Sequence, residues 1–176
     1  MKKTMTKFML FSMLFAGVSV QAADNLTFKG NLIIPNCTIN NNAPLETDFR
    51  DVEIQTLGSN PNTYSHEKLL SIPVRCPYNL GTPKMKISGK LHTPAKGAAG
   101  IQTSKYNEGL VIYLRTKAKD SWISYGREFN IPNDSITGGG VDKTLTMYAA
   151  LGYYKTMKDL KPGPFTAGTT LEMRYE

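Results

Sequence analysis

Few residues of this 176-residue chain have the types and spacing that catalysis or metal binding requires. His66 in YSHEK and His92 in KLHTP lie in polar stretches, where we expect exposed loop or strand-end positions. Asp134 and Asp142 flank the glycine run Gly138 to Gly140, but the spacing of oxygen ligands that calcium needs is missing. The glycine run itself is typical of a flexible turn. The sequence therefore predicts no enzyme, no metal site and no cofactor.

Aromatic and basic residues are the next candidates for a binding site. Trp122, Tyr125 and Arg127 share one predicted strand, and aromatic groups with a polar neighbour can stack on sugars. Partial burial in a β-sandwich core is the simpler explanation for the two aromatic residues. The formal net charge of +7 is spread along the chain without a run of Lys and Arg, so no nucleic-acid partner is predicted. No small-molecule substrate is predicted either.

The first 22 residues have the composition of a secretory signal peptide. Three lysines precede an apolar run from Phe8 to Val20, which is too short for a membrane span. Small residues offer a cleavage site after Ala22 or Ala23. We therefore expect an exported protein in which residues 1–22 are removed and the remainder forms one domain with its own core.

The only two cysteines are Cys37 and Cys76. In an exported chain a lone pair of cysteines predicts a disulfide, and two free thiols are the alternative. Closing a loop of roughly 40 residues stabilises a fold by about 4 kcal/mol in the chain-entropy model. Zinc binding is disfavoured because the cysteines lie far apart and the two histidines do not complete a ligand set.

Short β-rich segments recur along the chain and are separated by Gly, Pro and Asn clusters, which indicates an all-β sandwich. The expected strands are Leu26–Ile34, Val52–Leu57, Lys68–Cys76, Lys84–Leu91, Gly109–Thr116, Ser121–Ile131, Lys143–Tyr154 and a closing strand up to Tyr175. Pro73 inside one of them favours a sheet edge or a bulge. We expect residues 93–108 and 132–140 to form long surface loops.

The closing strand alternates between apolar or small residues and polar or small ones. Its inward set is Phe165, Ala167, Thr169, Leu171, Met173 and Tyr175. The sequence ends one residue later, at Glu176, so no following strand is expected to cover the far edge. An uncovered edge beside an apolar face is an aggregation hazard unless another segment fills it.

A second alternating segment follows the leader. Its same-face residues are Leu26, Phe28, Gly30, Leu32 and Ile34, and the residues between Leu26 and Leu32 on the other face are Thr27, Lys29 and Asn31. The two ends of the chain thus carry an apolar strand and a strand that lacks a neighbour.

These paired ends resemble pilins of the chaperone–usher pathway, and in particular the tip-fibrillum subunits of P-type pili. DNLTFKGNLIIPNCTI resembles the N-terminal extension of that family, which runs into its first cysteine, and DVEIQTL and RCPYNLG resemble the segments that follow. LGYY followed by GPF matches the approach to the last strand. Tyr175, second from the end, and Gly163, fourteenth from the end, fit the family pattern, whereas Thr169 is smaller and more polar than usual.

The resemblance implies an incomplete immunoglobulin-like sandwich, the pilin fold, which lacks its final strand and has a free N-terminal donor strand. It implies a signal peptide at 1–22, an extension at 23–35 and a pilin domain at 36–176. The donor residues would be Leu26, Phe28, Gly30, Leu32 and Ile34, with Gly30 facing a part of the groove that has no room for a side chain. The acceptor groove would include Gly163, Phe165, Ala167, Thr169, Leu171, Met173 and Tyr175, with a shallower groove at Thr169.

The resemblance also implies partners and a location. A periplasmic chaperone would lend a strand and bind the end of the chain at Glu176, and at an outer-membrane usher the extension of the next subunit would replace it. The product would be a head-to-tail fibre on the cell surface that supports adhesion. An adaptor or initiator pilin is the alternative within the family, and a secreted carbohydrate-binding sandwich is the alternative outside it. The length argues against a two-domain adhesin, and a periplasmic chaperone would be a complete sandwich with two domains.

Overall fold

The computed structural model of the chain describes residues 26–94, 98–117 and 123–176. The predicted signal peptide lies outside these residues. The chain divides into two units, Met1–Leu32 and Ile33–Glu176, and every strand of the described part lies in the second. No α-helix occurs among the described residues, and five short 3-10 turns join the strands at Asn40–Asn42, Ile54–Thr56, Tyr106–Glu108, Asn133–Ser135 and Met157–Asp159.

The larger sheet has seven antiparallel strands in the described part of the chain. In spatial order they are β1 (Thr38–Ile39), β2 (Tyr64–Arg75), β9 (Asp142–Tyr153), β6 (Leu110–Thr116), β5 (Gly100–Gln102) and β4 (Leu91–His92), and β8 (Ile136–Gly139) pairs with β9. The two long strands β2 and β9 form the centre, because apolar residues at every second position give each of them a buried face.

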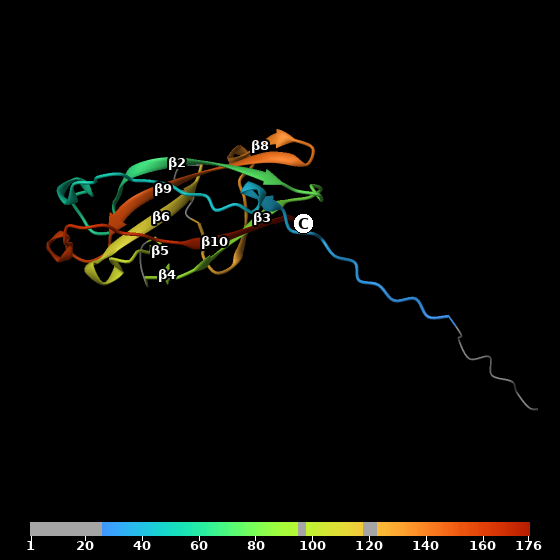
Figure 1. Cartoon of the computed structure of the whole chain (residues 1–176), viewed down its shortest axis with the longest axis horizontal. Coiled ribbons are helices and arrows are strands. Elements are labelled where there is room, and N and C mark those ends of the chain that lie inside the picture. Colours follow the sequence, from blue (N-terminus) through green and yellow to red (C-terminus); the bar gives the residue numbers. More distant parts are fainter. Residues whose placement is uncertain (1–25, 95–97, 118–122) are drawn as a thin grey trace, which may run out of the picture. The chain divides into compact units, whose positions relative to one another are not determined.

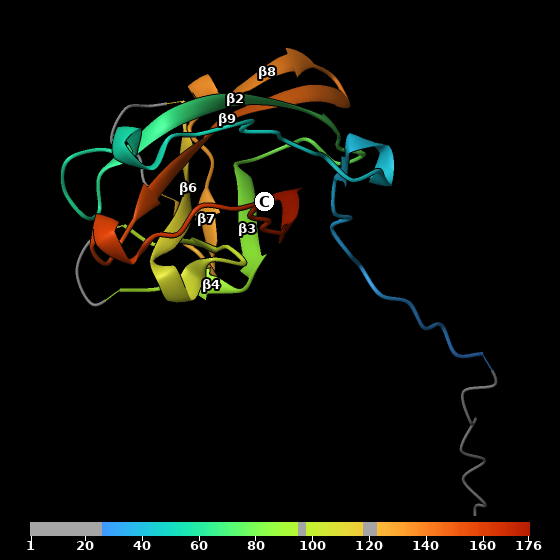
Figure 2. The same cartoon turned by 60° about the vertical axis from the view of Figure 1, so that its left-hand side comes forward.

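The smaller sheet consists of β10 (Thr169–Tyr175), β3 (Pro83–Gly89) and β7 (Glu128–Asn130), in that order. The register pairs Leu171 with Ile87 and Met173 with Met85, so the apolar residues of β10 and β3 lie on one face. That face packs against the larger sheet, and Figures 1 and 2 show β2, β9 and β6 in one layer and β3 and β10 in the other.

The core between the layers is well filled at its centre. Leu145 and Leu151 of β9 are fully buried, and Met85 and Met173 are each 1% exposed. The main-chain N–H of Leu114 donates a hydrogen bond of 3.1 Å to the Tyr125 hydroxyl, and burial raises the pKa of that phenol. The chain therefore has the all-β sandwich that the alternating segments predict.

Most expected strands are present, including the central ones at 68–76, 84–91, 109–116 and 143–154. The strand expected at Val52–Leu57 is wrong, because a 3-10 turn closes there through a 2.7 Å bond from the Thr56 hydroxyl to the Glu53 carbonyl. Of the segment expected as a strand at Ser121–Ile131, the structure describes residues 123–131, and among these only Glu128–Asn130 is a strand. At Pro73, β2 pairs with β9 on one side and with no strand of the described chain on the other, which agrees with the predicted sheet edge.

The two expected surface loops contain strands. Within residues 93–108, Gly100–Gln102 forms β5, and Ile101 is buried. Within residues 132–140, Ile136–Gly139 forms β8, which pairs with β9. The φ angles of +100° at Gly138 and +56° at Gly140 explain this hairpin, because glycine adopts such turn conformations at no steric cost. The glycine run thus ends β8, and Gly140 forms the turn of the hairpin with Val141.

Candidate functional site

The edge of β10 that faces away from β3 is open over most of its length. At one end the N–H of Cys37 donates a 2.7 Å hydrogen bond to the carbonyl of Met173, so this carbonyl points away from β3. Main-chain groups alternate between the two edges of a strand, so those of Leu171 and Thr169 point the same way. In the described part of the chain no strand pairs with β10 along this edge.

A groove runs beside this open edge, and its first half is a cavity of about 630 Å³, which we call the first chamber. Ala167–Glu172 form one wall, and residues between Asn36 and Phe49 form the other. The floor consists of apolar side chains from both sheets, among them Leu70, Ile72, Ile87, Ile101, Leu114 and Met147. These side chains have the apolar character that a strand with one apolar face requires of its neighbours.

The second half of the groove, the second chamber, has a volume of about 1370 Å³. Its walls are residues 45–55 and Lys161–Ala167, and its floor includes Leu57, Leu110, Leu151 and Leu160. Five residues line both chambers, so the two are parts of one groove; they are Leu45, Thr47, Phe49, Ile112 and Ala167.

The wall from Lys161 to Ala167 belongs to neither sheet, and polar bonds to the turn before β6 hold it in place. Ser104 bonds Thr166 twice: its N–H donates to the Thr166 carbonyl at 2.8 Å, and its hydroxyl accepts from the Thr166 N–H at 3.1 Å. Glu108 accepts from the Lys161 N–H at 2.9 Å, and Lys105 donates to the Lys161 carbonyl at 2.9 Å. The bond from Lys161 and the one from Lys105 lower the pKa of the Glu108 carboxyl. This half of the groove is therefore held open by the chain itself.

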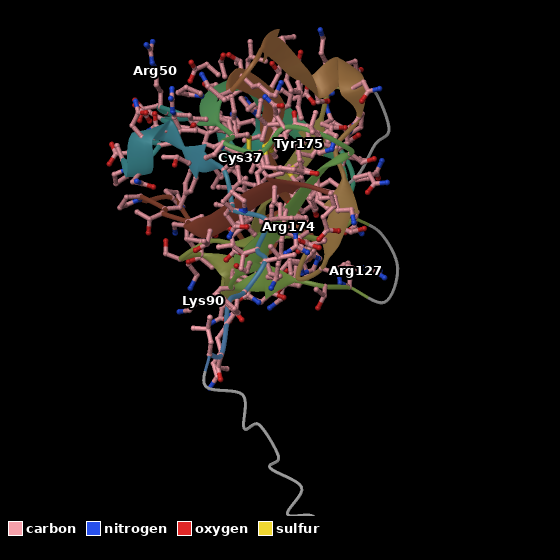
Figure 3. The ribbon with its side chains drawn as sticks, turned by 90° about the vertical axis from the view of Figure 1, so that its right-hand side faces the viewer. Cys37, Arg50, Lys90, Arg127, Arg174 and Tyr175 are labelled. Atoms are coloured by element: carbon pink, nitrogen blue, oxygen red, sulfur yellow. A yellow bond between two sulfur atoms is a disulfide. The ribbon has the colours of Figure 1, made fainter. Side chains whose placement is uncertain are left out.

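The far end of β10 is buried and ion-paired. Met173, whose carbonyl is bonded to Cys37 where the groove closes, and Tyr175 beyond it belong to the core, and burial raises the pKa of Tyr175 (Figure 3). Glu176 is exposed, and its side chain pairs with Lys84 and Arg174. The hydrogen bond from Lys84 is the main reason that the pKa of this carboxyl is lowered.

The predicted groove residues follow one another along the chain, but only some of them line the groove. Phe165, Ala167, Thr169 and Leu171 line the chambers, as does the exposed Gly163, whereas Met173 and Tyr175 lie in the core. The Thr169 hydroxyl donates a 2.8 Å bond to the Ser88 carbonyl. Phe49 and the floor residues were not singled out from the sequence. Inward alternation on the central strands was the signal for the floor residues, whereas Phe49 lies in an irregular segment.

The predicted donor segment belongs to a region without strand pairing. Residues 26–36 pair with no strand of the described chain, and their large apolar side chains are exposed: Leu26 is 71%, Phe28 85%, Leu32 106% and Ile34 42% exposed. A row of exposed apolar residues at every second position requires a partner, because leaving it in water forgoes the free energy of burial.

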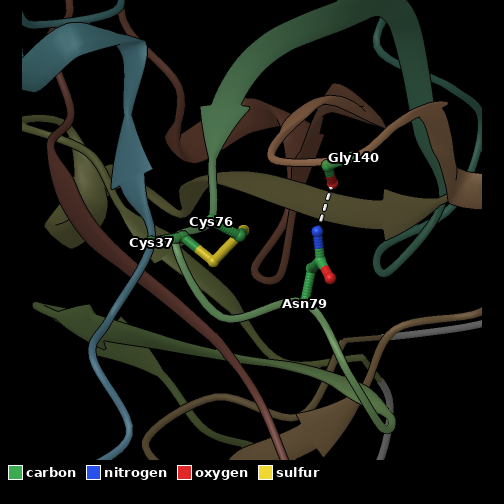
Figure 4. Close-up of a disulfide and its surroundings, with 4 residues drawn as sticks. All are labelled: Cys37, Cys76, Asn79 and Gly140. Atoms are coloured by element: carbon green, nitrogen blue, oxygen red, sulfur yellow. Dashed lines mark hydrogen bonds between the residues drawn. A yellow bond between two sulfur atoms is a disulfide. The ribbon is translucent and has the colours of Figure 1, made fainter.

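Cys37 and Cys76 form a disulfide, as predicted, with an S–S distance of 2.03 Å. Figure 4 shows that it ties the segment before β1 to the end of β2, next to a loop that Asn79 fixes by a 2.5 Å hydrogen bond to the Gly140 carbonyl. The bond places Cys37 where its N–H closes one end of the groove.

The other candidate residues have structural roles. His92, expected to be exposed, is buried at 4% exposure, with Nδ1 3.1 Å from the Tyr106 hydroxyl and its ring 4.6 Å from that of Tyr154. His66 is half-buried in β2 and contacts Ser65 and Thr56 through its two ring nitrogens.

Neither aspartate belongs to a ligand cluster. Asp142 pairs with Arg75 at 2.9 Å, and Asp134 accepts from the Ser135 hydroxyl at 3.2 Å. No group of three or more potential metal ligands occurs among the residues that the structure describes.

Of the residues considered for sugar binding, the two that the structure describes, Tyr125 and Arg127, differ in their surroundings. Tyr125 packs against the core and its hydroxyl is used by Leu114, whereas Arg127 is exposed; Trp122 lies outside the described residues. Within the described residues, none of the helical segments has the length and apolar character to span a bilayer.

The sequence profile of the family described as "Fimbrial protein" matches residues 26–176. The chain belongs to this fimbrial protein family. It is 35% identical to the fimbrial protein PrsE of Escherichia coli over 159 residues, which cover 89% of this chain and 87% of PrsE. It is 31% identical to the minor fimbrial protein PrsF of the same organism over 167 residues, which cover 95% of this chain and 96% of PrsF.

Solved structures agree on the fold of this fimbrial protein. The P pilus rod subunit PapA superposes with a TM-score of 0.56 at 18% identity, over 80% of this chain and 99% of PapA. A chain from a chaperone–usher pilus superposes with a TM-score of 0.53 at 18% identity, over 92% of this chain and all of that chain. The resemblance to chaperone–usher pilins that the two terminal motifs carry is thus confirmed, and the chain is a structural subunit of a fimbria.

Proposed function

We propose that this fimbrial subunit polymerises by donor-strand exchange, in which residues 26–34 of one molecule fill the groove beside β10 of the next. The observation that carries the proposal is the open edge of β10 above a two-chambered apolar groove. The exposed alternating segment 26–34 supplies the matching strand. Main-chain hydrogen bonds then give affinity, and alternate side chains fix the register.

The energetics favour a long-lived joint. Burying Leu26, Phe28, Leu32 and Ile34 at roughly 1.5–3 kcal/mol each gives an upper value of about 6–12 kcal/mol. Each new main-chain hydrogen bond adds about 1 kcal/mol. Because the donor lies at one end of the chain and the groove belongs to the following domain, the contact is head-to-tail and does not close on itself, so it extends a fibre.

Before assembly the groove requires a temporary occupant, since an open sheet edge promotes aggregation. We assign this role to a periplasmic chaperone that lends a strand and contacts Glu176, and we assign the exchange step to an outer-membrane usher. In this scheme residues 1–22 direct export, residues 23–35 form the extension and residues 36–176 the pilin domain. The subunit travels through the periplasm to the cell-surface fimbrium and has no catalytic role there.

We place the subunit in the tip fibrillum. The support is the resemblance of the terminal motifs to those of tip-fibrillum subunits. An adaptor position at a junction of the fibre is the second candidate, and the likeness to the fimbrial adapter PapF favours it. The 31% identity to the fimbrial adapter PapF extends over only 46% of this chain.

Strand exchange tests this proposal directly. The full chain is purified with its chaperone and incubated with a peptide of residues 24–36, and chaperone release is followed by gel filtration and native mass spectrometry. We expect the peptide to replace the chaperone, because its apolar face matches the groove. A control peptide with Phe28→Ser and Leu32→Ser should fail. A full chain that is stable, monomeric and indifferent to both peptides would contradict donor-strand exchange.

A further inference from the structure

Three exposed apolar side chains lie near the point where the extension joins the folded domain, and strand exchange leaves them unused. Ile33 is 79% exposed, and because it alternates with Leu32 and Ile34 it faces away from a groove that these two fill. Leu80 is 67% exposed and Tyr78 is 37% exposed, both in the loop that joins β2 to β3. We call Ile33, Tyr78 and Leu80 the root patch.

The disulfide brings the members of the root patch to the same end of the sandwich. The Cα atoms of Cys37 and Cys76 lie 4.2 Å apart (Figure 4). Tyr78 follows Cys76 by two residues, and Ile33 precedes Cys37 by four, which is about 13 Å of extended chain. The three side chains therefore surround the start of the extension. Exposed apolar residues that gather in this way mark an interaction surface.

The loop from β2 to β3 is held in place by polar bonds. Asn79 donates a 2.5 Å hydrogen bond to the Gly140 carbonyl, and Thr82 exchanges two main-chain bonds with Glu176, of 2.6 and 3.0 Å. The loop thus presents its two apolar side chains in a fixed position. Burying them against a partner then requires little loss of conformational entropy.

The chain that connects a donor strand to its own domain has one open way out of the acceptor groove. At one end of the groove the acceptor's own Cys37 N–H is bonded to the Met173 carbonyl, and the acceptor's own extension starts there. The other end of the β10 wall is Lys161–Pro164, which lines the second chamber and which we call the exit rim. In Figure 1 the segment before β10 lies at the far end of β10 from the C-terminus. The connection therefore leaves the groove at the exit rim.

The exit rim offers an apolar surface of its own. Pro162 and Pro164 are both exposed. The bonds of Lys161 to Glu108 and Lys105 fix this segment. Proline has no main-chain N–H that a partner would have to satisfy, so its ring can be covered by apolar side chains without loss of a hydrogen bond.

The connection between donor strand and domain is short and stiff. Only Pro35 and Asn36 separate Ile34 from Cys37, so the two Cα atoms can be no more than about 10 Å apart. Pro35 has a fixed φ angle and also restricts the residue before it. When Ile34 lies in the groove of one molecule, the domain that carries Cys37 must lie against the exit rim of that molecule.

We propose that the root patch of one subunit packs on the exit rim of a second copy, which adds a domain–domain contact to the donor strand. Ile33, Tyr78 and Leu80 cover Pro162 and Pro164 of the acceptor. This inference rests on the proposed donor-strand exchange, because the inserted strand brings the two surfaces together. The contact holds successive domains in one orientation, so the joint is not a free hinge.

A photoreactive residue at position 80 tests the contact within fibres. Full-length subunit with benzoylphenylalanine in place of Leu80 is purified with its chaperone, assembled into fibres, irradiated and analysed by denaturing gel and mass spectrometry. Leu69 is the matched control, because it is 60% exposed but lies in the middle of β2. We expect position 80 to give a cross-linked dimer through the peptide that contains residues 161–164, and position 69 to give none.

The double variant Tyr78→Ser and Leu80→Ser tests what the contact contributes to the joint. Its fibres should dissociate in urea about 10- to 100-fold faster than wild-type fibres, since each side chain loses part of its buried area. Leu69→Ser should change this rate by less than about 2-fold. The peptide of residues 24–36 lacks the β2–β3 loop and should displace the chaperone from the double variant as fast as from the wild type.

Two outcomes would overturn the inference: dissociation of the double variant at the wild-type rate, or cross-links from position 80 that match those from position 69. Both leave donor-strand exchange intact, because fibres still form. If the wild-type chain forms no fibres and the peptide does not displace the chaperone, the proposed function itself is overturned.

Discussion

The loss of stability caused by removing the disulfide between Cys37 and Cys76 follows from the length of the loop that it closes. The bond closes a loop with a sequence separation of 39 residues. In the chain-entropy model, losing such a cross-link destabilises the folded state by about 4 kcal/mol. Alanine is the better replacement for both cysteines, because Cys76 is fully buried and Cys37 is 8% exposed, and a serine hydroxyl there would need a hydrogen-bond partner.

The assay is urea unfolding of the full chain saturated with the donor peptide, with the Cys37→Ala and Cys76→Ala double variant compared with the wild type. With a slope of about 2 kcal/mol per M urea, the loss of about 4 kcal/mol lowers the unfolding midpoint by about 2 M. Reduction of the wild type with dithiothreitol is the control and should lower the midpoint by a similar amount.

The same variant should also bind the donor peptide less tightly, because Cys37 closes one end of the groove through its bond to Met173. A midpoint shift below about 0.5 M, or mass spectrometry that finds both thiols free in the exported protein, would refute the reasoning.

Three further predictions concern the core of the sandwich. Burial lowers the pKa of His92 below 6.5, so as the pH falls the unfolded chain binds a proton at this histidine before the folded chain does. The free energy of unfolding should therefore fall as the pH drops below about 6.5. In a His92→Phe variant the urea midpoint should lack the part of its pH dependence that comes from this histidine. Gly100→Ala should destabilise the fold by about 1–3 kcal/mol in urea titrations, since the added Cβ would lie 2.5 Å from Val111 Cγ1 and 2.7 Å from the Ile112 carbonyl. Leu145 has no exposed surface, so Leu145→Ala leaves a cavity and should lower the free energy of unfolding by about 2–5 kcal/mol in the same titrations. If either Gly100→Ala or Leu145→Ala lowers the free energy of unfolding by less than about 1 kcal/mol, the packing described is contradicted.

The strands that could be predicted from sequence are those whose alternation extends over many residues. β2, β9 and β10 each present one apolar face, and that pattern depends only on the period of an extended chain. The segment Val52–Leu57 has the same composition but turns after Glu53, where the local bond from the Thr56 hydroxyl competes with pairing. Such local bonds are not visible in hydrophobic periodicity.

The residues of one groove wall could be predicted from the sequence, and those of the other wall could not. Its β10 wall follows from the alternation of Phe165 to Leu171, whereas Phe49 lies in an irregular segment whose position depends on contacts distant in the sequence. The burial of His92 was missed for the same reason, because Tyr106 and Tyr154, which cover it, lie 14 and 62 positions further along the chain. Tertiary contacts of this range leave no local signature.

Hydrogen exchange of assembled fibres tests the central claim most directly, namely that residues 26–34 of one molecule fill the groove of another. Fibres and the chaperone-bound subunit are exchanged in D₂O and analysed by mass spectrometry of the peptides that cover residues 26–34 and 163–172. We predict that residues 26–34 exchange freely in the chaperone-bound subunit and become strongly protected in the fibre, while residues 163–172 are protected in both. Fibres in which residues 26–34 still exchange at the rate of an unstructured chain would contradict the account.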